Sequence, residues 1–267
     1  MIQRPATPRV LVVAGSDSGG GAGVQADIKT VTMLGGHAMT AITALTAQNT
    51  LGVQGVMPVP AEFVVAQMRS VLDDIGADAV KIGMIGSAGT AHAVADVLEG
   101  VGVPVVFDPV MVATSGSVLA DADTVRAFGR LMRLATAVTP NLPELDALGG
   151  EAAVLAHGCH LVAKGGHGAG DRLVDRLVAP DGREIARVEG ARIDTRHTHG
   201  TGCTLASALA CGLGAGMGIE EAFGRAVGYV RAAIEAAPGF GRGCGPVGVG
   251  VLGEAWTRRA APGGTHP

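Results

Sequence analysis

Short apolar runs alternate with segments of helical periodicity along most of the chain. Residues 10–14 form a continuous apolar run, which predicts a buried strand. A glycine-rich loop follows at 15–23, and apolar residues then recur at helical spacing, at Val24, Ile28, Val31 and Leu34. The chain therefore opens as strand, glycine loop and helix.

The same alternation continues to residue 236. Further strands are predicted at 38–45, 53–59, 79–82, 103–107, 137–139 and 161–164, and a hairpin at 173–179 with 184–188. Helices are predicted at 24–34, 62–75, 88–98, 122–134, 142–148, 202–213 and 219–236. This alternation is typical of the α/β class, with a mostly parallel sheet covered by helices on both faces. With no repeat or linker, we expect a single domain over 1–267, with a core at about 9–246 and a Gly-rich C-terminal tail.

Composition narrows the class of protein. The chain is 48% hydrophobic with 43 glycines, and its net charge of −4 without a basic run argues against nucleic-acid binding. No apolar run is long enough to span a bilayer, and 10–14 is too short for a signal sequence. The four cysteines form no close pair, which disfavours disulfides and structural zinc. We expect a cytoplasmic protein with free thiols and no membrane partner.

The stretch Thr198-His199-Gly200-Thr201-Gly202-Cys203-Thr204 runs directly into an Ala- and Leu-rich helix. The first backbone N–H groups of such a helix are unpaired and favour an anion, so this stretch is a candidate phosphate site. The alternative interpretation is a tight turn before a buried helix, with Cys203 as a small core residue.

Polar residues follow several of the predicted strands. They are Asp17 and Ser18, Gln48 and Asn49, Lys81, Asp108, Asn141 and Glu144, and Lys164. In a doubly wound sheet these positions converge at one edge, where ligands bind. Taken singly, each has a structural explanation as well: Asp108 before Pro109 is a common turn, and Asn141 with Glu144 is typical of a helix N-cap.

Two nucleotide motifs are disfavoured. None of the three lysines lies in a P-loop pattern. Residues 21–26 fit a loose dinucleotide fingerprint, but no acid lies between Asp27 and Glu62, where a ribose ligand is expected about 20 residues on.

Several stretches together resemble one family. The glycine loop GSDSGGGAGVQAD (15–27) and THGTGCTL (198–205) are similar to those of hydroxymethylpyrimidine/phosphomethylpyrimidine kinases. So are TALTAQNT (43–50), KIGM (81–84), DPVMV (108–112), TPNLPE (139–144) and KGGH (164–167). The resemblance runs in order from about residue 10 to 246. It implies a ribokinase-like three-layer sandwich and an ATP- and Mg²⁺-dependent kinase of thiamine biosynthesis. Such a kinase phosphorylates 4-amino-5-hydroxymethyl-2-methylpyrimidine and then its monophosphate, and is a homodimer.

The resemblance also implies roles for particular residues. Gly200, Thr201 and Gly202 would form the anion hole, and Lys164, Asn141 and Thr198 would contact ATP or its phosphates. Glu144 and Asp108 would organise Mg²⁺. The pyrimidine would lie against Asp27, Gln48, Gly15 and Met84.

Cys203 occupies the position of the catalytic Asp in related sugar kinases. A helix N-terminus can lower a thiol pKa below its usual value of about 8.5, whereas a nearby phosphate opposes that shift. Cys203 is therefore either a general base or a group that orients the substrate hydroxyl.

The chain departs from the family pattern in three places. Residues 149–160 are shorter than usual, so we expect a peripheral helix to be trimmed or lost. Arg196-His197 replaces a common Lys-Asn, and Cys244-Gly245-Pro246 keeps only part of a Gly-His-Gly-Pro. We expect His167 and His199 to be structural or to lie beside the phosphates.

Two other functions stay open at this point. One is a pyridoxal or pyridoxine kinase of the same fold. The other is a non-catalytic pyrimidine- or nucleotide-binding protein, against which the combination of Cys203, Asn141, Glu144 and Lys164 argues.

Overall fold

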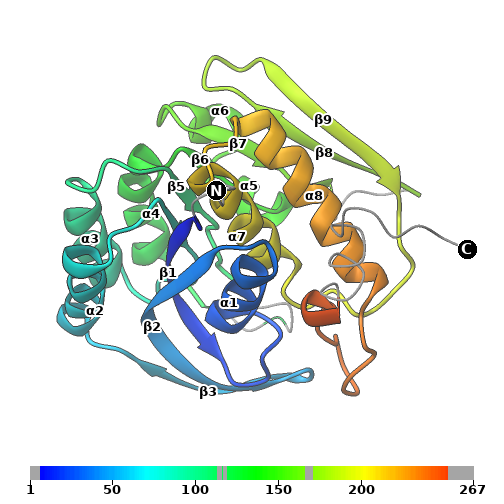
Figure 1. The fold of residues 1–267 in the computed structure, drawn as a ribbon, viewed down its shortest axis with the longest axis horizontal. Coiled ribbons are helices and arrows are strands. Elements are labelled where there is room, and N and C mark those ends of the chain that lie inside the picture. The colour runs from blue at the N-terminus through cyan, green and yellow to red at the C-terminus, as the bar shows by residue number, and fades with distance from the viewer. Residues whose placement is uncertain (1–6, 113–115, 117–118, 166–170, 252–267) are drawn as a thin grey trace, which may run out of the picture.

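The computed structural model describes residues 7–112, 116, 119–165 and 171–251. Their strands form one nine-stranded sheet in the order β3-β2-β1-β4-β5-β6-β7-β8-β9 (Figure 1). The strands are β1 (Arg9–Asp17), β2 (His37–Asn49), β3 (Gly52–Pro58), β4 (Ala79–Ile82), β5 (Val105–Phe107), β6 (Ala137–Val138), β7 (His160–Ala163), β8 (Arg172–Val178) and β9 (Glu184–Ala191). From β2 to β7 the neighbouring strands are parallel, and β3, β8 and β9 add antiparallel edges.

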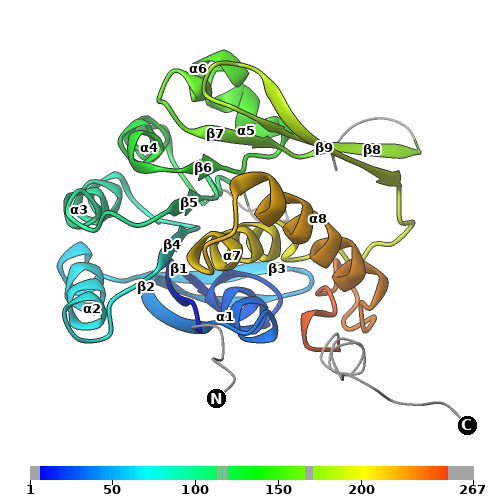
Figure 2. The same cartoon turned by 45° about the horizontal axis from the view of Figure 1, so that its top comes forward.

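Helices cover both faces of this sheet. They are α1 (Gly23–Met33), α2 (Ala61–Asp74), α3 (Ala88–Leu98), α4 (Ala122–Leu134), α5 (Leu142–Ala147), α6 (Glu151–Leu155), α7 (Thr201–Gly214) and α8 (Ile219–Glu235), with a 3-10 turn, η2 (Val249–Val251). Figure 2 shows α2, α3 and α4 on one side of the sheet and α1, α7 and α8 on the other. The three-layer arrangement expected from the sequence is confirmed.

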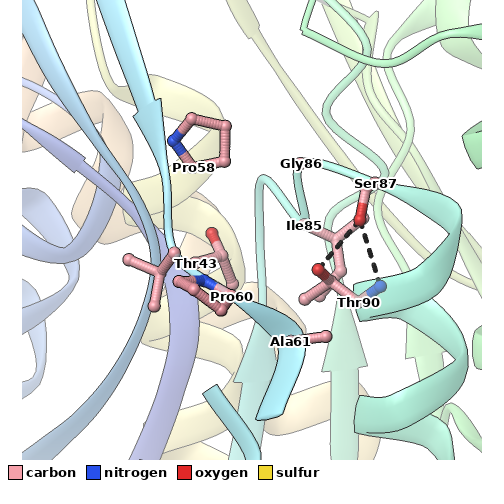
Figure 3. A pocket seen from close by; sticks show the side chains of 9 residues that line it. Thr43, Pro58, Pro60, Ala61, Ile85, Gly86, Ser87 and Thr90 are labelled. Carbon is pink, nitrogen blue, oxygen red and sulfur yellow. Dashed lines mark hydrogen bonds between the residues drawn. The ribbon is translucent and has the colours of Figure 1, made fainter. Parts of the chain in front are cut away.

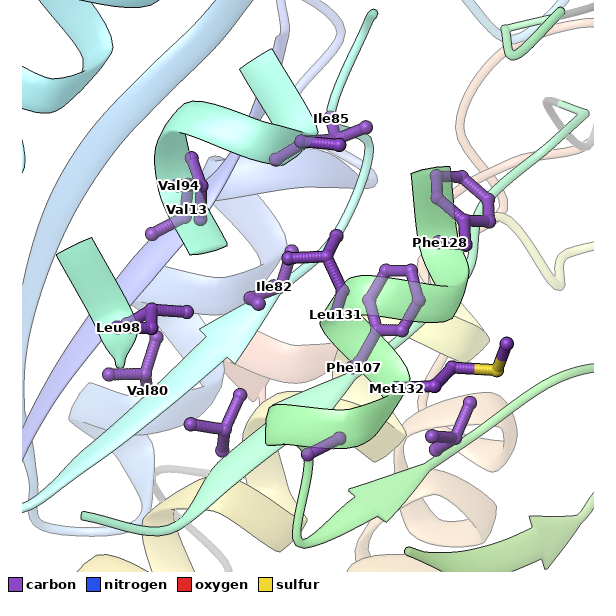
Figure 4. Packing of buried hydrophobic residues seen from close by; sticks show 14 of the residues in the cluster. Val13, Val80, Ile82, Ile85, Val94, Leu98, Phe107, Phe128, Leu131 and Met132 are labelled. Carbon is purple, nitrogen blue, oxygen red and sulfur yellow. The ribbon is translucent and has the colours of Figure 1, made fainter. Parts of the chain in front are cut away.

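The core is split in two by the sheet because alternate residues of a strand point to opposite faces. In β1, Leu11 and Val13 join the cluster under α2, α3 and α4, whereas Val10, Val12 and Ala14 join the cluster under α1, α7 and α8. Figure 4 shows the first cluster, in which the rings of Phe107 and Phe128 meet edge to face at 5.1 Å. The continuous apolar run of β1 thus reflects burial on both faces.

Most predicted elements agree with the structure. The strand expected at 38–45 extends to Asn49, so Gln48 lies within β2. Lys81 was expected among the polar residues at the sheet edge, but it lies inside β4, the strand predicted at 79–82, whose four residues are all buried. The shortened segment 149–160 keeps a five-residue helix, α6. Within the described residues, no helix has the length and apolar character needed to cross a membrane.

Candidate active site

A cavity of about 850 Å³ opens at the carboxyl ends of the parallel strands. Every site residue predicted from the sequence lines it except Asp27: Gly15, Gln48, Met84, Asp108, Asn141, Glu144, Lys164, Thr198, Gly200, Thr201, Gly202 and Cys203. Residues of β8, of the segment after β9 and of α8 close its far side, including Leu173, Ile193, Val230 and Ile234. The predicted convergence at one edge of the sheet holds for most of the polar residues that follow strands, but Ser18, Asn49 and Lys81 do not line the cavity.

The N-terminus of α7 faces this cavity. Its N-cap is Gly200, which has a left-handed backbone (φ +90°) and provides no capping side chain. A Cβ atom at Gly200 would lie 1.9 Å from the Gly21 carbonyl oxygen, so the loop before α7 presses directly on the glycine loop before α1. This contact exposes the first N–H groups of a 14-residue helix at the cavity wall.

The Asp108 carboxylate and the Lys164 ammonium lie beside that helix terminus. Lys164 Nζ donates to Asp108 Oδ1 at 3.2 Å, and Thr139 Oγ1 donates to the same oxygen at 2.9 Å. A Cβ at Gly202 would lie 3.4 Å from both Lys164 Nζ and Asp108 Oδ2. Burial disfavours the ammonium, but Asp108 and Glu144 outweigh it and raise the pKa of Lys164. Lys164 is therefore a fixed positive charge at the α7 terminus.

Asn141 and Glu144 form the capping box of α5. Asn141 Oδ1 accepts from Glu144 N at 2.9 Å, and Glu144 Oε2 accepts from Asn141 N at 2.8 Å. Burial and the nearby Asp108 carboxylate raise the pKa of Glu144 to about 7. The cap interpretation is therefore confirmed, and the cap also places the Glu144 carboxyl group at the cavity, close to a second carboxylate.

The Cys203 thiol is protonated in the ligand-free site. Burial raises its pKa to about 11, although the Lys81 ammonium and the Gly23 backbone N–H act in the opposite direction. Of the two roles expected for Cys203, this direction favours orienting the substrate hydroxyl, because loss of hydration opposes ionisation of the thiol.

Asp27 lies behind the cavity wall. Its carboxylate is wholly buried and accepts from Lys81 Nζ at 2.9 and 2.8 Å and from Ser207 Oγ at 2.7 Å. The expectation that Asp27 contacts the substrate is corrected, because its oxygens are occupied by a buried lysine and a serine. Lys81 is likewise absent from the cavity edge.

A pair that sequence reasoning did not assign joins the two loops. Asp17 Oδ2 accepts from His199 Nε2 at 2.8 Å and from the backbone N–H groups of Gly21 and Ala22 at 3.0 and 2.8 Å. His199 Nε2 also lies 3.3 Å from Gln48 Nε2. Asp17 and His199 are both nearly buried. The signal was present in the sequence, since Asp17 follows the first strand and His199 precedes Gly200, but their 182-residue separation hid the pairing.

The departures from the family pattern lie outside the cavity wall. Neither Arg196 nor His197 lines it, whereas Thr195 and Thr198 on either side do. Cys244 is partly exposed and also lies off the wall. His167 falls outside the described residues.

A second cavity of about 290 Å³ lies between the β2–β3 hairpin and the first turns of α2 and α3 (Figure 3). It is lined by Thr43, Pro58, Val59, Pro60, Ala61, Ile85, Gly86, Ser87 and Thr90. Its hydroxyl groups are already paired, Ser87 with Thr90 and Thr43 with the Met84 carbonyl. None of the predicted site residues lines it.

Known proteins resemble this chain in both sequence and fold. A family model described as phosphomethylpyrimidine kinase matches residues 17–248. The hydroxymethylpyrimidine/phosphomethylpyrimidine kinase of Streptomyces coelicolor is 50% identical over 262 residues, covering 92% of this chain and 96% of that protein. The protein of the same name from Rhizobium meliloti is 46% identical over 258 residues, covering 90% and 96%.

Two solved structures resemble the fold closely. The ADP complex of Bacillus subtilis pyridoxal kinase has a TM-score of 0.83 at 31% identity, covering 92% of this chain and 99% of that one. Phosphomethylpyrimidine kinase from Clostridium difficile has a TM-score of 0.73 at 34% identity, covering 85% and 100%. This similarity confirms the ribokinase-like fold class expected from the sequence.

Proposed function

This chain belongs to the phosphomethylpyrimidine kinase family, and on that premise we propose that it phosphorylates 4-amino-5-hydroxymethyl-2-methylpyrimidine and then its monophosphate, in thiamine biosynthesis. The chain is a phosphotransferase that uses ATP. The observation that carries the substrate assignment is the 50% identity to a kinase of that name over 92% of the chain.

The phosphate end of the cavity is formed by α7 and Lys164. The N–H groups following Gly200 meet the transferring phosphoryl group, and the Lys164 ammonium neutralises charge that spreads over its oxygens. The chain thus positions the phosphoryl group by fixed dipoles and one fixed charge.

The carboxyl groups of Asp108 and Glu144 suit a magnesium ion. Mg²⁺ is usually held by one or two protein carboxylates together with substrate phosphates. The described residues fit this pattern, because they bring these two carboxyl groups to the cavity beside the proposed phosphate site. Asp108 and Glu144 would hold the ion, which would supply positive charge to the phosphates of ATP. Asn141 fixes the Glu144 carboxyl group from its own backbone N–H.

The pyrimidine end is formed by Gly15, Gln48 and Met84. The Gln48 amide offers both a donor and an acceptor, which matches a ring nitrogen next to an exocyclic amine. The Thr43 hydroxyl donates to the Met84 carbonyl at 2.6 Å and so holds the segment that carries the Met84 side chain. We assign Asp27 to support of this region rather than to direct contact.

Cys203 lies between the two ends. In the reaction the substrate hydroxyl oxygen attacks the γ-phosphorus of ATP while the bond to the β–γ bridging oxygen breaks and ADP leaves. Because the ligand-free thiol is neutral at pH 7, Cys203 first orients the hydroxyl, and any transfer of the hydroxyl proton to sulfur requires the thiol to ionise beforehand.

The test is ADP release with Mg-ATP against hydroxymethylpyrimidine, its monophosphate and pyridoxal, measured side by side. Turnover of both pyrimidines is the expected result. Turnover of pyridoxal alone would favour the second candidate, a pyridoxal kinase, which the TM-score of 0.83 to such an enzyme supports. ATP and pyrimidine binding without ADP release would indicate a non-catalytic binding protein.

We also propose a cytoplasmic homodimer that forms through the β2–β3 edge. Leu45 and Met57 pair in register and are 44% and 67% exposed, and Phe63 is 60% exposed at the start of α2, next to Pro60 of the smaller cavity. An apolar surface at a sheet edge favours association with a second copy. Met57→Glu is expected to give a monomer by light scattering, and Ile28→Glu, on α1, is the matched control.

A further inference from the structure

An ion pair lies directly beneath the proposed active site without reaching it. Lys81, Asp27 and Ser207 have no exposed surface at all. Lys81 Nζ donates to both Asp27 oxygens, and Ser207 Oγ donates to one of them. Burying two charges costs hydration energy that their attraction often only balances, so an apolar pair would fill this space without that cost. The location of the pair therefore needs a reason other than stability.

Two helices place this pair one turn below Cys203. On α7, Ser207 follows Cys203 by four residues, which puts both side chains on the same helix face. On α1, Asp27 follows Gly23 by four residues, and Gly23 and Cys203 both line the cavity. The first residues of both helices thus meet the cavity, and one turn further along Ser207 of α7 donates a hydrogen bond to Asp27 of α1.

Four charged groups act on the Cys203 sulfur. Lys81 comes from β4 and Lys164 follows β7, while Asp27 comes from α1 and Asp108 follows β5. Lys164 already pairs with Asp108 at the phosphate end of the cavity. Lys81 is charged at the pH of the assay below, because Asp27 and the other nearby anions outweigh the effect of its burial and raise its pKa.

We propose that Lys81 is a positioning residue for the reaction: its buried ammonium stabilises negative charge on the Cys203 sulfur, and Asp27 fixes and moderates that ammonium. The inference rests on the proposed role of Cys203 at the substrate hydroxyl. It assigns opposite effects to the two members of one ion pair. Lys81 favours the thiolate, and Asp27 opposes it.

The experiment measures the alkylation rate of Cys203 by iodoacetamide at pH 8 in the ligand-free, Mg²⁺-free protein. All variants carry Cys244→Ser, because Cys244 is the other partly exposed thiol among the described residues. Lys81→Met is expected to slow alkylation about tenfold, which corresponds to about one pKa unit. Asp27→Asn is expected to accelerate it by a smaller factor, about threefold, because Asp27 has the smaller effect on Cys203. Lys29→Met, an exposed lysine on α1, is the matched control and is expected to change the rate less than twofold.

The double variant Lys81→Met with Asp27→Asn keeps the test decisive if a single variant fails to fold. It buries no net charge and is expected to react more slowly than the parent, because Lys81 has a larger effect on Cys203 than Asp27 has. Equal rates in the double variant and the parent, or single variants that change the rate in the same direction, would overturn the proposal.

The alkylation rate does not depend on turnover. If Cys203→Ala kept its activity, the proposed role of the thiol would fail, while the alkylation series would still show whether the ion pair controls the sulfur. If the series failed while ADP release from pyrimidines persisted, the proposed function would stand and this inference alone would be wrong.

Discussion

Replacing Gly200 by alanine should disturb the active site more than the rest of the fold. The new methyl carbon would lie 1.9 Å from the Gly21 carbonyl oxygen, so one loop must move by about 1.5 Å to reach ordinary contact. That movement strains the hydrogen bonds from Gly21 and Ala22 to Asp17, each worth about 1–3 kcal/mol when a buried group is left unpaired. The left-handed backbone of an alanine adds about 1 kcal/mol.

Gly216, just beyond the other end of α7, supplies a matched control. It has φ +83° and nothing within 4 Å of a Cβ, so Gly216→Ala carries the backbone strain without the clash. We expect a loss of roughly 3–5 kcal/mol for Gly200→Ala and about 1 kcal/mol for Gly216→Ala. A shift of about 1 Å in the α7 N–H groups should also lower kcat about 100-fold in Gly200→Ala alone.

The assays are urea unfolding followed by far-UV circular dichroism, and ADP release at saturating substrate. Far-UV detection suits this chain because helices cover both faces of its sheet. Equal destabilisation in the two variants, with kcat within twofold of each other, would refute the idea that the two loops are held in contact at Gly200.

Three further predictions concern single side chains. Cys203→Ala should largely abolish turnover while ATP and pyrimidine still bind in calorimetry; near-parental turnover would exclude the thiol from the reaction. Burial raises the pKa of Asp17, but the His199 hydrogen bond and backbone N–H groups outweigh it and lower the pKa overall. Its stabilising effect is therefore present above the unfolded pKa of about 4 and is lost as the pH falls through the folded value, so the stability gap between the parent and Asp17→Asn should narrow below pH 4 in acid titrations. Burial and Asp108 raise the pKa of Glu144 from 4.5 to about 7, so the folded state binds more protons than the unfolded state between these values. The free energy of unfolding should therefore fall as the pH rises from 4.5 to about 7. Glu144→Gln should remove that slope in thermal melts without Mg²⁺, and an unchanged slope would place the titrating group elsewhere.

The sequence predicted the layers, most of the elements and the edge of the sheet at which polar residues gather. Apolar periodicity is a local property, so the buried strand β1 and the amphipathic helix α4 could be read directly. The wall of the cavity was also predictable, because the carboxyl ends of parallel strands lie at the same edge of the sheet whatever the strand order.

Pairings across the fold could not be read in the same way. Lys81 lies inside a strand and is acceptable there only because Asp27 on α1 meets it, a fact of packing that no spacing in the chain encodes. Asp17 and His199 are likewise separated by most of the chain. The state of the Cys203 thiol depends on how completely the site is dehydrated, which only the assembled structure shows.

The contacts that complete the site are among the most distant in the chain, since Asp17 with His199 and Asp27 with Ser207 span 182 and 180 residues. The glycine loop emerges from the ribosome early, but its partners on α7 emerge only after the whole sheet. A nascent or truncated chain without α7 would therefore lack the proposed phosphate site, however well its first strands and helices had folded. Nucleotide binding would then report that synthesis has passed α7, and saturating ATP would draw the chain toward its fully folded state by mass action.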